Sequence, residues 1–170
     1  MRTQEELKSI QQRLVDAVKS KNMPEVMQLI SDAGINLNTE VCGFTACHYI
    51  GRFADDSLRV LLQANSELDF NIDRYARGAA EAGHRAYAEQ LRTQRGADVN
   101  RIAPGAALGG HRAYAEELRT QQDVDEDRIA RGAAFGGHRA YAEQLRTQHG
   151  ASVHWIARGA ALGDHRDYAE

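Results

Sequence analysis

The chain has 170 residues and a formal net charge of −3, which excludes the broad positive field that non-specific nucleic-acid binding requires. No apolar run approaches the roughly 20 residues that span a bilayer, and the polar first residues lack the apolar stretch of a signal peptide. Two cysteines, Cys42 and Cys47, indicate neither a disulfide framework nor a zinc ribbon. These features predict a cytoplasmic protein without a membrane span.

The N-terminal part begins with a predicted helix pair in residues 14 to 38, where a helix of small residues precedes one rich in Val, Met, Leu and Ile. Further along, Thr45 to His48 read TACH, and Leu61 and Leu62 precede the ending LDFN. These residues resemble ankyrin repeats, whose consensus has TPLH and paired leucines at these places. The 33 residues from Asn38 to Asn71 equal the ankyrin period.

The last hundred residues repeat at a period of 27. Four columns of identical residues show it: Gly78, Gly105, Gly132 and Gly159; His84, His111, His138 and His165; Tyr87, Tyr114, Tyr141 and Tyr168; Glu89, Glu116, Glu143 and Glu170. Each unit has a small apolar segment that ends on glycine, followed by a segment such as HRAYAEQLRTQ with apolar residues at helical spacing. Since glycine tolerates the left-handed conformation past a helix end, each unit is predicted to be helix, turn, helix.

The composition of the units predicts how they pack. An interior glycine such as Gly132 costs a helix about 1 kcal/mol relative to alanine, but with Ala133 and Ala134 it removes bulk and lets neighbouring units approach closely. On the second helix, Glu143 pairs with Arg139 and Arg146 at i,i+4 and i,i+3 spacing. One unit cannot bury its own apolar face, whereas stacked units can.

The repeated units also resemble ankyrin repeats in part, at GADVN (96–100) and at AAxxGH (106–111). They lack TPLH, which is replaced by RIAP and RIAR, and they are shorter by about the length of the family's hairpin finger. The resemblance implies an all-α, ankyrin-like helix-turn-helix solenoid of stacked helix pairs. Residues 1–71 are expected to hold ankyrin-like repeats with a leading helix, and residues 72–170 four 27-residue units, the last incomplete.

The in-phase histidines suggest a metal site, but equivalent helices in a stack are about 8 to 10 Å apart, whereas zinc ligands lie about 2 Å from the metal. We therefore expect each imidazole to bind a backbone group across its turn.

Cys47 and His48, with Asp55 and Asp56 downstream, are residue types of a thiol nucleophile and its base. The ankyrin alignment instead places Cys47 at a core leucine position, and no phosphate-binding loop motif occurs, so no catalytic site, metal or cofactor is predicted.

Arginines recur at the first helix of each unit. The residues predicted to bind a partner are Arg74, Arg101 and Arg128, with Trp155 in the fourth copy, and Arg77, Arg131 and Arg158 three residues later, where Pro104 is the exception. The ankyrin resemblance implies that this helix lines the concave face, where partners of the family bind, and Arg and Trp are enriched in interface hot spots. Alternatively, these arginines pair with acids of adjacent units, such as Asp73, Asp127 and the run DVDED.

The predicted function is a non-catalytic protein–protein interaction scaffold that binds a protein partner on the concave face. Its near-identical copies resemble those of effectors that bacteria deliver into eukaryotic cells, which implies a host protein as partner and a location in the host cytosol. Two alternatives stay open. The chain is the targeting or regulatory part of an enzyme, with thiol chemistry at Cys47 and His48 or a catalytic domain beyond Glu170, or it is an architectural protein that self-associates through its uncapped last unit.

Overall fold

The computed structural model describes residues 3–31, 37–38, 40–41, 44–53, 59–60 and 71–165. In this part of the chain the fold is all-α, as predicted. Its helices are α1 (Gln4–Lys19), α2 (Met23–Ile30), α3 (Ala46–Phe53), α5 (Ile72–Glu81), α6 (Arg85–Arg95), α7 (Val99–Leu108), α8 (Arg112–Gln121), α9 (Glu126–Phe135), α10 (Arg139–His149) and α11 (Val153–Leu162). Several residues that entered the predictions lie outside the described ranges: Cys42, Asp55, Asp56, Leu61, Leu62, Tyr168 and Glu170.

The first helix pair is α1 and α2, which pack against each other, while α1 also packs against α3. Thr3 begins α1 with a capping box, because its hydroxyl accepts from the Glu6 amide and the Glu6 carboxylate accepts from the Thr3 amide. Pro24 lies in the first turn of α2, where a missing amide hydrogen breaks no helical bond. Leu14 and Val26 of this pair are fully buried.

A short hairpin precedes α3. Strands β1 (Glu40–Val41) and β2 (Phe44–Thr45) pair antiparallel, with Glu40 opposite Thr45 and Val41 opposite Phe44. The all-α prediction named no strands, but it expected the shortened units, in contrast to the 33-residue one, to lack a hairpin finger. The hairpin lies in the part of the chain that has the 33-residue period, and no strand occurs in the described residues 71–165.

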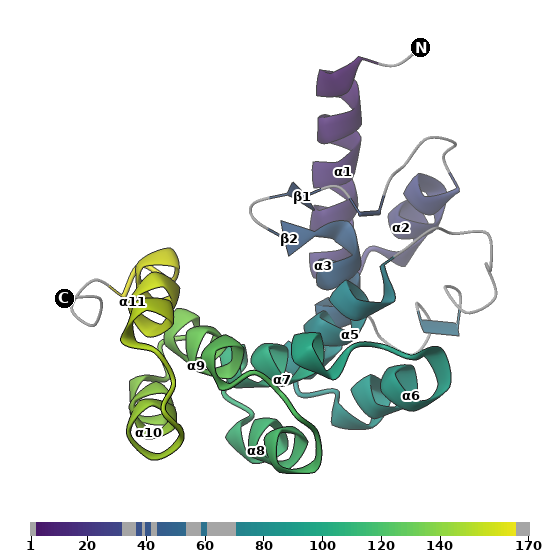
Figure 1. The fold of residues 1–170 in the computed structure, drawn as a ribbon. Coiled ribbons are helices and arrows are strands. Elements are labelled where there is room, and N and C mark those ends of the chain that lie inside the picture. The colour runs from purple at the N-terminus through teal and green to yellow at the C-terminus, as the bar shows by residue number, and fades with distance from the viewer. Residues whose placement is uncertain are drawn as a thin grey trace.

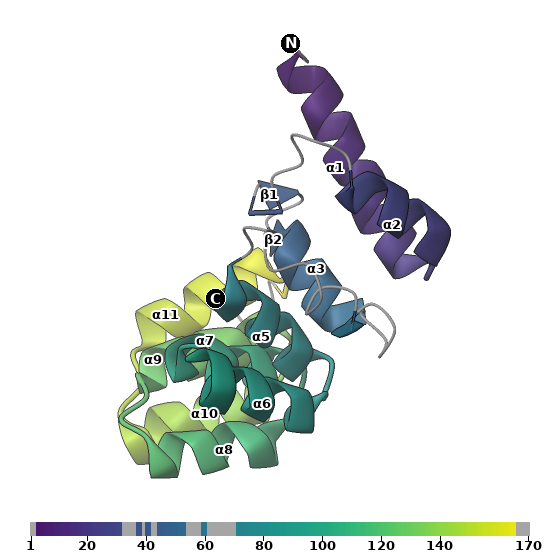
Figure 2. The same ribbon diagram turned by 90° about the vertical axis from the view of Figure 1, so that its right-hand side faces the viewer.

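The other helices form a curved row (Figure 1). The first helices of the units, α3, α5, α7, α9 and α11, pack side by side in chain order. The second helices, α6, α8 and α10, each pack on the first helix of their own pair and lie farther apart from one another. Figure 2 shows the same two layers from the side. The first helices therefore form the inner, concave side of the row, between the N-terminal helices at one end and α11 at the other.

Helix starts and ends follow from short polar residues and glycine. Asn71, Asp98 and Asp125 precede α5, α7 and α9, and the side chain of each accepts a backbone amide of the first turn at 2.9 to 3.0 Å. At the turns between helices, Gly83, Gly110 and Gly137 have φ of +79, +78 and +77°. This confirms that glycine supplies the left-handed conformation after α5, α7 and α9, whereas after α11 Asp164 has it with φ of +59°.

Glycine also brings neighbouring first helices together, as predicted. A Cβ added to Gly105 in α7 would lie 2.6 Å from the carbonyl oxygen of Arg77 in α5. Gly132 and Gly159 face the carbonyl oxygens of the preceding helices in the same way. Side chains larger than hydrogen at these positions would force the helices apart.

A second set of contacts joins the start of each first helix to the one before it. The Asp98 amide donates to Asp73 at 2.8 Å, the Asp125 amide to Asn100 at 3.2 Å, and the Ser152 amide to Asp127 at 2.6 Å. Each donor comes 25 residues after its acceptor. The polar residue at position 73, 100 or 127 therefore has a structural role in stacking.

Candidate functional site

A groove of about 660 Å³ lies on the concave side of the row. Helix positions i, i+3 and i+7 share a face, so each first helix can present three side chains to the groove. The lining residues fall into three columns: Thr45, Arg74, Arg101, Arg128 and Trp155; His48, Arg77, Pro104 and Arg131; Phe135 and Leu162. Asn100, Asp125, Asp127 and Gly132 complete this surface, which we call the concave groove.

The structure places six of the seven predicted partner-binding residues on this one surface. Arg74, Arg77, Arg101, Arg128, Arg131 and Trp155 line the groove, and Arg158 stacks on the Trp155 ring. Phe135 and Leu162 were missed from the sequence. Their signal was an apolar residue four positions after the second arginine column, on the same helix face.

Trp155 contacts two arginines. The guanidinium carbon of Arg131 is 5.6 Å from the centre of its ring, and that of Arg158 is 5.3 Å away. Cation–π contacts at exposed sites contribute about 0.5–1 kcal/mol each. Burial lowers the pKa of Arg131, and the charge of Arg158 lowers it further. Among the described residues neither arginine has an acidic partner, so two positive charges share one indole.

Internal pairing, the alternative role for these arginines, is seen at Arg128. The Nε of Arg128 lies 3.2 Å from the Asp125 carboxylate in the same helix turn, and both side chains are about half exposed. Ion pairs of this kind contribute about 0–1 kcal/mol. Asp73 and Asp127, predicted as further acidic partners, accept backbone amides of the following unit. In the described part of the chain, Arg101 has no acidic partner, and neither do the two arginines on Trp155.

Arg77 is the most enclosed cation of the groove. Burial lowers its pKa, the Glu81 carboxylate opposes that effect, and the positive charges of Arg101 and Arg131 lower the pKa again. Neighbouring cations thus act on one another along the groove. An anion bound there would relieve part of this repulsion.

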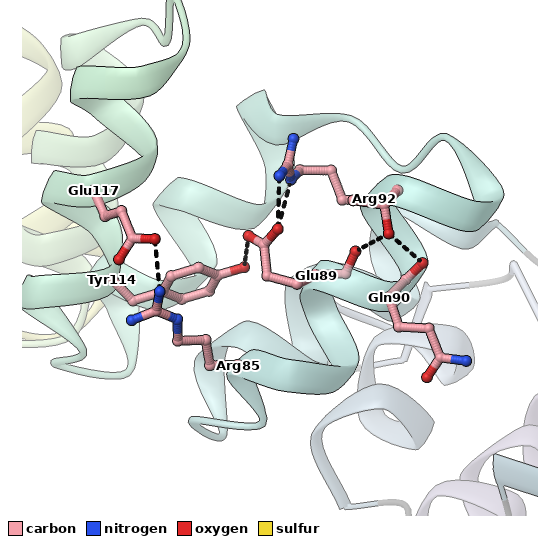
Figure 3. A network of polar contacts seen from close by, with 7 residues as sticks. Arg85, Glu89, Gln90, Arg92, Tyr114 and Glu117 are labelled. Carbon is pink, nitrogen blue, oxygen red and sulfur yellow. Dashed lines mark hydrogen bonds and ion pairs between the residues drawn. The ribbon is translucent and has the colours of Figure 1, made fainter.

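The arginines of the second helices have different surroundings (Figure 3). Arg92 forms an ion pair with Glu89 at 2.7 Å, and Glu89 also accepts the hydroxyl of Tyr114 from the next unit at 2.8 Å. Arg85 forms an ion pair with Glu117 at 2.6 Å, again in the next unit. These contacts confirm the predicted i,i+3 pairs and add bonds between units. The outer side of the row therefore balances its charges within the chain.

A buried ionic cluster joins α3 to α5. His48 Nε2 lies 2.7 Å from one Glu81 oxygen, and Arg52 Nη1 lies 2.7 Å from the other. The side chains of His48 and Glu81 are 2 and 6% exposed. Burial lowers the pKa of His48, while the hydrogen bond and charge of Glu81 oppose the decrease. Sequence reasoning missed this cluster, although Glu81 is the charged exception in a column that otherwise has Leu108 and Phe135.

Cys47 is 1% exposed, and its thiol donates to the side-chain oxygen of Asn38 at 3.3 Å. This placement matches the core position that the ankyrin alignment assigned to it. Thr45 Oγ accepts the amide of His48 at 3.3 Å, so the TACH segment keeps a bond between its first and last residues. The two aspartates considered with this thiol, Asp55 and Asp56, lie outside the described residues.

Two of the in-phase histidines bind backbone carbonyls, but of the preceding unit instead of their own turn. His111 Nε2 lies 3.1 Å from the Glu81 carbonyl oxygen, and His138 Nε2 is 3.1 Å from that of Leu108. A carbonyl can only accept, so Nε2 carries the proton in both. A Cβ added to Gly110 would lie 2.7 Å from Cε1 of His138. Glycine is therefore required at this position for space as well as for its positive φ. Within the described residues, no three His, Cys, Asp or Glu side chains are placed to hold a metal ion.

Comparison with protein-family models finds no match for this chain, and a search of curated proteins finds none. In the part that the structure describes, no helix combines the length and the apolar character needed to cross a bilayer. The function is therefore inferred from the concave groove and its contacts.

Proposed function

We propose that the chain is an ankyrin-like solenoid that acts as a non-catalytic scaffold and binds a protein partner in the concave groove. The observation that carries this proposal is the cluster of Arg131, Trp155 and Arg158. It lies on the inner face of the row, and no acidic side chain of the described residues neutralises it.

The arrangement of helices supports the solenoid. Each first helix packs on the next, each second helix packs on its own first helix, and bonds between units recur at the same position. The hairpin β1–β2 lies where the 33-residue period holds, and the shortened units contain no strand within 71–165. This is the division expected for ankyrin repeats followed by units without the hairpin finger.

The chemistry of the groove supports a protein as ligand. Arginine and tryptophan are the side chains most enriched among residues that dominate binding energy in protein interfaces. At the edge of the groove, Leu162 is 57% exposed, and an apolar side chain in that position gains stability when a partner covers it. The proposed link to bacterial effectors stays a prediction, since it rests on the repeated sequence alone.

Site-specific photo-cross-linking tests the proposal. A photoreactive amino acid replaces Arg101 in the groove or, as matched control, Gln94 on the exposed side of α6. We expect a discrete protein adduct from the groove position only, and its loss when Trp155→Ala and Arg131→Ala are introduced. Equal adducts from both positions, or an adduct that survives both substitutions, would remove the concave groove as the binding surface.

A further inference from the structure

We infer that the partner presents an extended acidic segment, in which a carboxylate binds Arg131 and Arg158 while an apolar side chain two residues away lies on Phe135 and Leu162. This inference rests on the proposed function and specifies the chemistry of its ligand.

The carboxylate of the inferred segment follows from the two arginines on Trp155. The cation–π contacts with the indole engage the charge of each guanidinium group and leave its N–H groups able to donate to an acceptor. Because the indole already orients Arg131 and Arg158, less side-chain entropy is lost when an anion binds. A carboxylate fits two guanidinium groups through charge-assisted hydrogen bonds and offsets the repulsion between them.

The apolar side chain of the inferred segment follows from the positions of Phe135 and Leu162 along their helices. Phe135 comes four residues after Arg131, and Leu162 four residues after Arg158, so each pair shares a helix face. Arg131, Phe135 and Leu162 line the groove. Four residues of helix advance about 6 Å. In an extended chain, side chains at i and i+2 share a face and are about 6.6 Å apart. An extended segment that follows the helix direction therefore meets the two guanidinium groups at Trp155 first and the Phe135 and Leu162 edge farther along the same helices.

Single-stranded nucleic acid is the competing ligand, since stacked aromatic rings and arginines also bind bases and phosphates. The groove argues against it in two ways. Asp125 and Asp127 line the same surface and would repel a polymer with a charge on every nucleotide, whereas a segment with one or two carboxylates can avoid them. The exposed apolar side chain of Leu162 has no counterpart in a sugar–phosphate backbone.

Fluorescence titration tests the inference directly, because Trp155 is the single tryptophan of the chain. The probes are a short synthetic peptide with glutamate and leucine at i and i+2, its twins with glutamine for glutamate or serine for leucine, and oligothymidylate. We expect saturable binding of the glutamate–leucine peptide that weakens with added salt. Each twin should bind about tenfold more weakly, as should the parent peptide to Arg131→Gln or Arg158→Gln.

Arg112→Gln is the matched control, since Arg112 lies on the second helix α8 and stacks on Tyr141, outside the groove. It should leave peptide binding unchanged, and circular dichroism checks that each variant folds. Equal binding of the glutamate and glutamine peptides, or tighter binding of oligothymidylate, would overturn the inference. If the groove cross-link forms but the acidic peptide is not preferred, the acidic segment alone is refuted. If the groove cross-link fails, the proposed function falls as well.

Discussion

Gly105 offers the sharpest test of how closely the units stack. A Cβ at this position would lie 2.6 Å from the Arg77 carbonyl oxygen and 2.9 Å from the Arg77 Cγ. Ordinary contacts begin near 3.4 Å, so Gly105→Ala requires α5 and α7 to separate by about 0.8 Å. In an exposed helix the same substitution would stabilise by about 1 kcal/mol, because alanine is the better helix former. Overpacking costs about 1–3 kcal/mol, and a clash with a backbone carbonyl falls at the upper end of that range. After the helix-propensity gain is subtracted, we expect the free energy of unfolding to fall by about 1–2 kcal/mol.

Urea denaturation followed by circular dichroism measures this change. A shift of the midpoint with an unchanged slope would assign the effect to the folded state. Ala113→Gly, on the exposed side of α8, measures the helix-propensity contribution in the same chain and should lower stability by about 1 kcal/mol. If Gly105→Ala leaves stability unchanged or raises it, the close approach of α5 and α7 is wrong.

Three further predictions use the same denaturation assay. His111→Ala leaves the Glu81 carbonyl without its donor and should cost about 1–3 kcal/mol; an unchanged midpoint would contradict that role. Tyr114→Phe removes only the hydroxyl that donates to Glu89 and should cost about 1.5–3 kcal/mol, as for bonds to charged groups; a neutral result would show that the bond between units contributes nothing. Because the pKa of His48 is lowered in the folded state, the unfolded chain binds its proton more readily, and stability should fall as pH drops below about 6.5. His48→Gln should flatten that dependence, and an unchanged slope would exclude His48 as its source.

Local features of the fold could be predicted from the sequence because they depend on residues close together in the chain. The apolar spacing predicts the helix pairs, and glycine at positions such as Gly110 predicts the left-handed turns. The recurrence of arginine three residues apart places both arginine columns on one helix face. These features need no knowledge of the neighbouring unit, since hydrogen bonds and side-chain neighbours within a helix span only three or four residues.

The contacts between units were decided by the tertiary structure. His111 binds a carbonyl of the preceding unit, Asp73 accepts an amide of the next one, and Glu81 pairs with His48 instead of lying in an apolar column. The contact of Trp155 with Arg131 of the preceding unit was not predicted either. These partners are 24 to 33 residues apart, and they meet only because of the offset at which one helix pair stacks on another. A periodic sequence specifies that units repeat, but the offset arises from close backbone packing at the glycines, which can be measured only once the units are assembled.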